Sequence, residues 1–262
     1  VKLSRAGADA VVVREFDLQS KTFVKHGFEL PEAKSRVSWV DQNTLLIGTD
    51  FGADTLTDSG YPRIAKRWKR GTPLTDAEII FEGKKDSVAI FASRIFSKDG
   101  HIDLIVDIPT FFTKVAYILQ DGDWLKVNKP DSADLSGYFN NQIFIQLKEE
   151  WKVADITYPA GAVIYASTDA ILTNNTEFKI LVKNAKTKII SNLFFTKSAI
   201  LVNWLDNVKS VIERYSLQAD GSYQAQQLSL DNSGTLSVLD SNENSDDFLV
   251  NYENFLQPDS LL

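Results

Sequence analysis

The sequence contains no cysteine, no methionine and only two histidines. Without cysteine, the chain has no disulfides, thiolate metal sites or cysteine nucleophiles. Two histidines also leave little material for a zinc centre or for a Ser-His-Asp triad. His26 precedes Gly27, and His101 follows the turn-forming Lys98-Asp99-Gly100, so we interpret both as polar residues beside turns.

Several sequence motifs of catalytic and binding sites are also missing. The chain has no G-x-S-x-G, no G-x-G-x-x-G and no G-x-x-x-x-G-K-[ST] motif. We therefore predict no catalytic, cofactor-binding or metal-ligating residue within residues 1–262, and no enzyme activity for this chain alone.

Long hydrophobic runs are absent as well. No stretch approaches 18 consecutive apolar residues, and the start at Val1–Ala10 lacks the pattern of a secretion signal. We expect a soluble, cytoplasmic protein that contacts no membrane; a periplasmic one is the alternative if a signal was removed upstream. Because a natural chain should begin with methionine, we also expect a processed chain or an excised fragment.

The charge balance is acidic and uneven. The net charge is −7; the first 131 residues carry 19 basic and 19 acidic side chains, and the rest carry 9 and 16. A chain of this kind is a poor nucleic-acid binder, because phosphate neutralisation supplies most non-specific affinity. We interpret its one basic cluster as the solvated end of a hairpin, with a phosphate or partner patch as the alternative: Lys66, Arg67, Lys69 and Arg70.

Strand-like periodicity dominates what is present. Within residues 101–108, Ile102, Leu104 and Val106 alternate with polar residues, as expected of a strand with one face against a layer. The chain also contains a longer repeat of strand-rich segments. The first apolar residues of its five copies are spaced by 51, 47, 54 and 47 positions: Val37, Val88, Leu135, Ile189 and Leu236. A period near 50 with four strands per repeat predicts an all-β fold, a β-propeller of four-stranded antiparallel blades.

The predicted propeller domain covers residues 1–262, with blades at about 36–82, 87–128, 134–183 and 187–230. Residues 10–24 resemble two outer strands of a blade, and residues 235–262 begin with two inner strands. We predict that they pair as a composite fifth blade through a ladder between Val11–Phe16 and residues 247–254, because an unpaired edge invites aggregation. An open arc that dimerises through its edges is the alternative. The tryptophans are expected to pack between blades: Trp39, Trp68, Trp124, Trp151 and Trp204.

Two short motifs resemble modification or metal sites. Alternate positions of one loop resemble the start of a calcium loop, although Ser245 replaces its glycine and Asn251 its bidentate glutamate: Asp240, Asn242, Asn244 and Asp246. We interpret this segment as an acidic hairpin loop. The sequon Asn174-Asn175-Thr176 marks a surface loop only in a protein that meets a glycosylation machinery.

Several phrases of the sequence resemble one known family. ADAVVVREFDL, LPEAKSRVSWVDQNTLLIGTDFG, LTDSGYPRIAKRWKRGTPL and SAILVNWLDNVKSVIERYSL are similar to the propeller of prolyl oligopeptidase-family (S9) serine peptidases. The final VNYENFLQPDSLL resembles the propeller segment that leads into their hydrolase domain. The similarity covers nearly the whole chain, and residues 87–180 match more loosely.

The resemblance implies that this chain corresponds to one part of a longer peptidase. Members of the family carry a Ser-Asp-His triad in an α/β-hydrolase domain, and a seven-bladed propeller restricts that site to short proline-containing peptides. The chain starts as if the first blades were missing and stops before the hydrolase domain, so no triad position has a match here. The implied partners are the catalytic domain of the same polypeptide and short peptides.

Two other functions stay open at this stage. A free-standing propeller would serve as a protein-interaction scaffold, since propellers host many functions. A glycosidase or lectin on the same fold would need two carboxylates about 5–10 Å apart in one cavity. The full reading frame separates the peptidase propeller from the free-standing scaffold. A downstream G-x-S-x-G with a following Asp and His supports the peptidase, and a stop codon shortly after Leu262 supports the scaffold.

Overall fold

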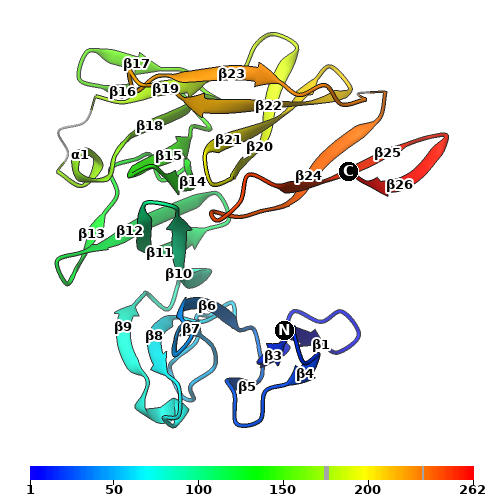
Figure 1. The fold of residues 1–262 in the computed structure, drawn as a ribbon. Helices are drawn as coiled ribbons and strands as arrows, with labels where there is room; N and C mark the ends of the chain where they lie inside the picture. Colours follow the sequence, from blue (N-terminus) through cyan, green and yellow to red (C-terminus); the bar gives the residue numbers. More distant parts are fainter. Residues whose placement is uncertain (174–176, 232) are drawn as a thin grey trace. The chain divides into compact units, whose positions relative to one another are not determined.

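The computed structural model describes residues 1–173, 177–231 and 233–262. The chain forms two compact units, Val1–Arg94 with Ile102–Val127 and Ile95–His101 with Asn128–Leu262. Strands make up most of each unit (Figure 1). Within the described ranges the only α-helix is the short α1, Thr168–Leu172, and a 3-10 helix, η1, covers Leu74–Asp76.

The first unit contains most of the strands from the N-terminal half. They are β1 Lys2–Ser4, β2 Val11–Arg14, β3 Phe16–Asp17, β4 Thr22–Phe23, β5 Glu29–Ala33, β6 Arg36–Asp41, β7 Thr44–Gly48, β8 Ile64–Lys69, β9 Glu78–Glu82, β10 Ala89–Ser97, β11 Gly100–Thr110, β12 Thr113–Gln120 and β13 Asp123–Lys126. The sheets are β1-β2-β5, β6-β7-β8-β9 and β10-β11-β12-β13, with β3 and β4 as a separate ribbon. The tip of the β10–β11 hairpin belongs to the second unit.

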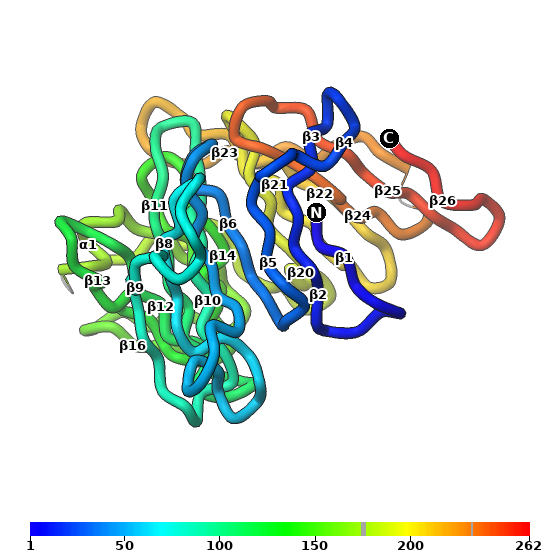
Figure 2. Tube along the Cα trace, turned by 90° about the horizontal axis from the view of Figure 1, so that it is seen from below, coloured from blue at the N-terminus to red at the C-terminus, as the bar shows by residue number. Residues whose placement is uncertain are grey.

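The second unit repeats the same arrangement. Its strands are β14 Asp134–Phe139, β15 Gln142–Gln146, β16 Trp151–Val153, β17 Ile156–Tyr158, β18 Val163–Ser167, β19 Lys179–Val182, β20 Lys188–Phe195, β21 Ala199–Asp206, β22 Lys209–Leu217, β23 Tyr223–Gln227, β24 Thr235–Ser241, β25 Phe248–Asn254 and β26 Gln257–Leu261. They form the sheets β14-β15-β18-β19, β20-β21-β22-β23 and β24-β25-β26, and β16 pairs with β17 as an inserted hairpin. Figure 2 follows the last sheet from orange to red.

The predicted all-β class with four-stranded antiparallel sheets is confirmed. Strands follow one another across each sheet in chain order, with the β3–β4 ribbon inserted in the first sheet and the β16–β17 hairpin inserted in the sheet β14-β15-β18-β19. In such a meander the chain reverses after every strand, so successive turns alternate between the two ends of the sheet. Turns between first and second strands therefore lie at one end, and turns between second and third strands lie at the other.

The predicted ladder between Val11–Phe16 and residues 247–254 is wrong. β2 lies between β1 and β5, and β25 lies between β24 and β26, so each strand uses both of its edges within its own sheet. The flanking strand β1 was missed because it is exposed and has no alternating apolar pattern.

Core residues of each unit lie between neighbouring sheets. Ala199–Trp204 of β21 are all buried, although strands with one solvated face would alternate. Ile200 and Val202 join a cluster with Phe144 of β15, whereas Leu201 joins a cluster with Leu236 of β24. Alternate side chains of one strand thus pack against two different sheets, as expected of stacked blades.

The first unit follows the same rule around β7. Leu45 and Ile47 share a cluster with Leu30 of β5, while Leu46 packs with Ile90 of β10. The sheet β6-β7-β8-β9 is therefore covered on both faces by its neighbours within the unit. This double coverage explains why the inner strands read as nearly continuous apolar runs.

Candidate functional site

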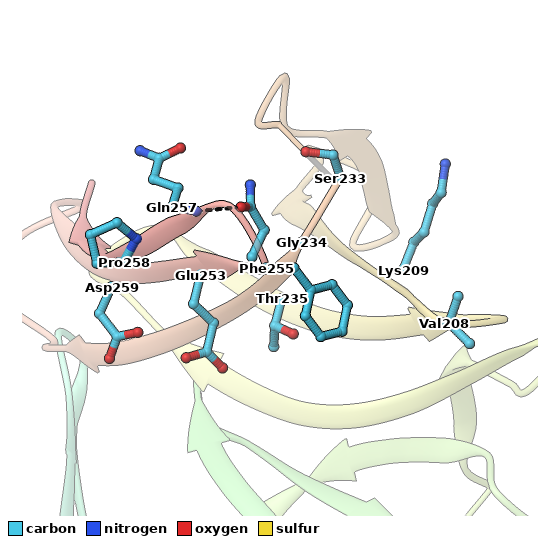
Figure 3. A pocket seen from close by; sticks show the side chains of 11 residues that line it. Val208, Lys209, Ser233, Gly234, Thr235, Glu253, Phe255, Gln257, Pro258 and Asp259 are labelled. Carbon is cyan, nitrogen blue, oxygen red and sulfur yellow. Dashed lines mark hydrogen bonds between the residues drawn. The ribbon is translucent and has the colours of Figure 1, made fainter.

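A groove of about 700 Å³ lies beside the last sheet, and we call it the terminal groove (Figure 3). Its walls come from residues 208–209 in the β21–β22 turn, residues 233–235 at the start of β24, and parts of residues 253–259 around the β25–β26 turn. All of these segments belong to the second unit. Turns and strand ends, rather than strand faces, therefore build this site.

Tight turns hold apolar side chains at the rim of the terminal groove. Phe255 and Leu256 form the whole link between β25 and β26, and they are 106% and 98% exposed. The side-chain oxygen of Asn254 accepts hydrogen bonds from the backbone N–H groups of Leu256 and Gln257, both at 2.8 Å. This Asn-based turn fixes the two apolar residues outside the core. Across the groove, Val208 is 88% exposed.

Two acidic side chains give the groove a negative side. Figure 3 shows Glu253 and Asp259 pointing the same way from β25 and β26. Hydrogen bonding with Asp259, followed by repulsion between the two charges, raises the pKa of Glu253. No ion pair joins either carboxyl to a lysine or arginine of the described chain, although Lys209 also lines the groove. A cation brought to this side would relieve the repulsion.

Gly234 sets the close approach of the strands that border the groove. A Cβ atom at this position would collide with the backbone oxygen of Glu253 and the side chain of Asn254. Only glycine therefore lets β24 start so near the end of β25. Sequence analysis did not identify the groove; the visible signal was a pair of apolar residues, Phe255-Leu256, at a turn position.

Both histidines lie at exposed positions in or beside turns. His26 is exposed and has φ +57° in the turn before Phe28. His101 is exposed at the start of β11, with its ring centroid 6.2 Å from that of Phe96. Both positions agree with the interpretation of these residues as flanking turns.

The basic cluster is largely engaged by neighbouring side chains. Arg70 donates two hydrogen bonds to Glu15, at 2.8 and 2.9 Å, and Arg67 pairs with Glu78 at 3.7 Å. The Lys66 ammonium lies 4.4 Å from the ring centroid of Phe51. These contacts favour a structural role at the hairpin end over a phosphate site.

The calcium-like loop is held by its own hydrogen bonds. Asp246 accepts from the Thr196 hydroxyl at 2.7 Å and from the Ser198 backbone and hydroxyl at 2.8 and 2.6 Å. Burial opposes ionisation of Asp246, but these hydrogen bonds outweigh it and lower the pKa. Asn242 accepts from two backbone N–H groups of the same loop. The polar side chains thus tie the β24–β25 loop to the β20–β21 turn.

The sequon 174–176 lies outside the described residues.

This arrangement predicts that calcium does not stabilise the chain. The oxygens of Asp246 already accept three hydrogen bonds, so calcium would have to displace them. We expect an unchanged unfolding midpoint between EDTA and millimolar calcium in a thermal-shift assay. A clear upward shift that Asp246→Asn abolishes would contradict this expectation.

The tryptophans divide between core and surface. Trp68 is buried and meets Phe28 at a centroid distance of 4.9 Å, and Trp204 is buried in the cluster around β21. Trp124 meets Phe81 of the adjacent sheet at 6.5 Å. Trp151 instead packs within the β16–β17 region against Tyr158 and Phe178, and Trp39 is 45% exposed. The expected packing between sheets is therefore found for Trp68, Trp124 and Trp204, and not for Trp151.

Comparison with known proteins assigns the class of this fold. Stacked antiparallel sheets of four strands define a β-propeller type of domain. The family model "Prolyl oligopeptidase, N-terminal beta-propeller domain" matches residues 2–262, so the chain belongs to that family.

The relatives are peptidases of greater length. The chain is 32% identical over 270 residues to an uncharacterized peptidase, y4nA, of Sinorhizobium fredii, covering all of this chain and 37% of that protein. A post-proline cleaving enzyme from Rickettsia typhi superposes with a TM-score of 0.90 at 25% identity, over 99% of this chain and 40% of that one. The chain thus spans well under half the length of these relatives. Among its described residues, no helix has the length and apolar character needed to cross a membrane.

Proposed function

We propose that residues 1–262 act as the substrate-gating propeller of a prolyl oligopeptidase-like serine peptidase that cleaves short proline-containing peptides. The family match over residues 2–262 carries this proposal. Because the chain covers only 37–40% of the relatives, the catalytic triad belongs, in this proposal, to an α/β-hydrolase domain elsewhere in the same polypeptide. Residues 1–262 then provide no catalytic, cofactor-binding or metal-ligating group.

The packing of the sheets supports a gating role. Neighbouring sheets share continuous cores around β7 and β21, and close-packed cores resist deformation. A wall of this kind excludes substrates by size, whereas a loose collection of loops would admit extended segments of larger proteins. We further propose that the sheets at 36–82, 87–128, 134–183 and 187–230 are successive blades of one domain, and that the protein is cytoplasmic.

Peptides of graded length test the proposal. The full-length protein is expected to hydrolyse a chromogenic proline-containing peptide, to lose activity with a serine-directed phosphonofluoridate, and to cleave the same sequence less as it is lengthened or embedded in a folded protein. Residues 1–262 alone are expected to give only the buffer rate. Efficient cleavage that ignores substrate size argues against gating, and full-length protein without proline-directed cleavage argues against the activity.

A free-standing interaction scaffold is the second candidate. The exposed Phe255 and Leu256 favour it, because clustered exposed apolar residues mark contact surfaces. The two candidates differ in one observable property. A scaffold would retain partner binding in a polypeptide that lacks a hydrolase domain, whereas the peptidase requires that domain.

A further inference from the structure

Trp39 is the one exposed tryptophan of the chain, and it lines a small pocket of the first unit. It is 45% exposed, whereas each of the other four tryptophans, all of them described, is buried or half-buried. The pocket, which we call the Trp39 pocket, measures about 290 Å³, and its other lining residues are Glu15, Asp41, Gln42 and Arg70. All of them belong to the first unit. This volume suits the head group of one side chain better than a whole peptide.

A network of contacts holds the Trp39 ring and neutralises two charges of the pocket. The Phe28 ring meets Trp39 edge-on at a centroid distance of 5.6 Å, and the Arg70 guanidinium lies 4.6 Å from the Phe28 centroid. Arg70 donates two hydrogen bonds to Glu15 and two to the carbonyl of Gln42. A wall that is already fixed in this way loses little conformational freedom when a ligand binds.

Asp41 supplies the unpaired charge of the pocket. Its Oδ1 accepts a hydrogen bond from the backbone N–H of Asn43 at 2.7 Å, and no ion pair joins it to a lysine or arginine of the described chain. Lys69 is near in register, because Thr44 lies opposite both Asp41 and Lys69, but Lys69 does not line the pocket. Since the other two charges cancel, the pocket keeps one net negative charge beside an exposed indole.

The second unit shows which group fits between an indole and a carboxylate. The Lys188 ammonium lies 4.4 Å from the centroid of the Trp204 ring and pairs with the carboxylate of Glu213. Such a cation is attracted both by the negative face of the ring and by the carboxylate. The Trp39 pocket offers the same two groups, but no lysine or arginine of the described chain lies over its indole ring.

We propose that the Trp39 pocket binds an organic cation, the guanidinium or ammonium group of a peptide, against the Trp39 ring and the Asp41 carboxylate. A sugar or a proline ring would also stack on an exposed indole, but neither would compensate the charge of Asp41. The side-chain amide of Gln42 makes no hydrogen bond within the described chain, so it is available to the peptide group next to the cation. The site goes beyond the proposed function, because binding of the cation requires no peptidase activity.

Fluorine NMR of the full-length protein labelled with fluorotryptophan tests the site. The Trp39 resonance is identified by its loss in Trp39→Phe, and the remaining resonances show whether that variant stays folded. N-acetylarginine amide is expected to shift the Trp39 resonance saturably with a millimolar Kd. N-acetylcitrulline amide, its uncharged isostere, should bind several-fold more weakly, because the cation–π contact and the exposed ion pair each contribute about two- to fivefold.

Two further probes identify the source of the cation. N-acetyllysine amide carries its charge on a side chain, and alaninamide carries it at the amino terminus, so the tighter of the two shows which kind of group the pocket takes. The absence of a saturable shift with any of the three cations overturns the proposal. Equal affinity for the arginine and citrulline probes also overturns it.

Asp41→Asn tests the charge without removing the ring. Asp50→Asn is the matched control, because Asp50 likewise accepts at Oδ1 from the backbone N–H two residues on, that of Gly52, and does not line the pocket. Asp41→Asn is expected to weaken binding of N-acetylarginine amide about two- to fivefold at low salt and less at high salt, and Asp50→Asn to leave it unchanged. Equal affinities of the two variants refute the role of Asp41.

Turnover of the proline peptide is measured on the same samples. A full-length protein that binds the cation but does not cleave the peptide refutes the proposed activity alone. A protein that cleaves the peptide but shows no shift of the Trp39 resonance refutes the cation site alone.

Discussion

Replacing Asp103 by alanine is expected to lower the free energy of unfolding by about 3–5 kcal/mol, because it leaves a desolvated cation without its partner. Both carboxylate oxygens of Asp103 accept hydrogen bonds from the Arg94 guanidinium, at 2.6 and 2.8 Å. The Asp103 side chain is 4% exposed and that of Arg94 is 15% exposed. Arg94 also donates to the carbonyl of Val40, which keeps it in place and prevents easy escape to water.

The control for Asp103→Ala is an exposed pair from the same unit. Arg5 and Glu32 lie 3.3 Å apart with side chains 83% and 38% exposed. Glu32→Ala is therefore expected to change the free energy of unfolding by at most about 1 kcal/mol. Urea unfolding curves of both variants, compared at equal slopes, measure the difference. Equal costs for the two variants would show that the Arg94–Asp103 pair is effectively solvated.

Glu213→Ala is expected to destabilise the second unit by about 3 kcal/mol, because it leaves several partly buried donors without their acceptor. The carboxylate of Glu213 accepts hydrogen bonds from Lys188, from the Trp204 indole at 2.8 Å and from the Tyr215 hydroxyl at 2.7 Å. Burial, then the hydrogen bond to Glu213 and its charge, raise the pKa of Tyr215, so the hydroxyl keeps its proton and its role as donor well into the alkaline range. Urea unfolding of the variant measures the loss.

The same residue makes the second unit sensitive to acid. Burial opposes ionisation of Glu213, but hydrogen bonds from Lys188 and Tyr215 outweigh it, and the folded-state pKa lies below the usual value of 4.5. The stabilisation is therefore complete above the unfolded-state pKa and is lost as pH falls through the lower folded-state pKa. Unfolding curves between pH 7 and pH 3 should show less acid destabilisation for Glu213→Gln than for the unchanged chain. If the free energy of unfolding falls equally with pH in Glu213→Gln and in the unchanged chain, Glu213 is not a source of the acid sensitivity.

The strand β11 shows how far the sequence pattern predicts burial. Ile102 and Leu104 are buried, as the alternation predicts. Asp103 was expected to point away from the layer, yet the residue as a whole is buried, and Ile105 is fully buried. Period-two reasoning assumes one solvated face, whereas four successive residues of this strand, 102–105, are all buried. The pairing with Arg94, nine residues away, could not be read from the pattern.

Features made by short or polar segments were harder to predict. β1 and β26 add strands at sheet edges, where pairing depends on backbone groups that every residue carries. The hairpin β16–β17 was missed for a similar reason, because each strand has only three residues. The terminal groove arises where three turns meet, and sequence periodicity contains no information about which turns become neighbours in space.

The alternating contacts of β21 also bear on how the second unit unfolds. The sheet that contains β21 contributes to two interfaces, one through Ile200 and Val202 and one through Leu201. In a stack of this kind the total stability approximates a sum of terms for single sheets and for nearest-neighbour pairs. Loss of the β24-β25-β26 sheet would remove the second interface and leave the first intact, whereas loss of the β21 sheet would remove both. Within the second unit, opening of the β24-β25-β26 sheet therefore costs less packing between sheets than opening of the β21 sheet, so native-state hydrogen exchange should be faster in β24–β26 than in β21.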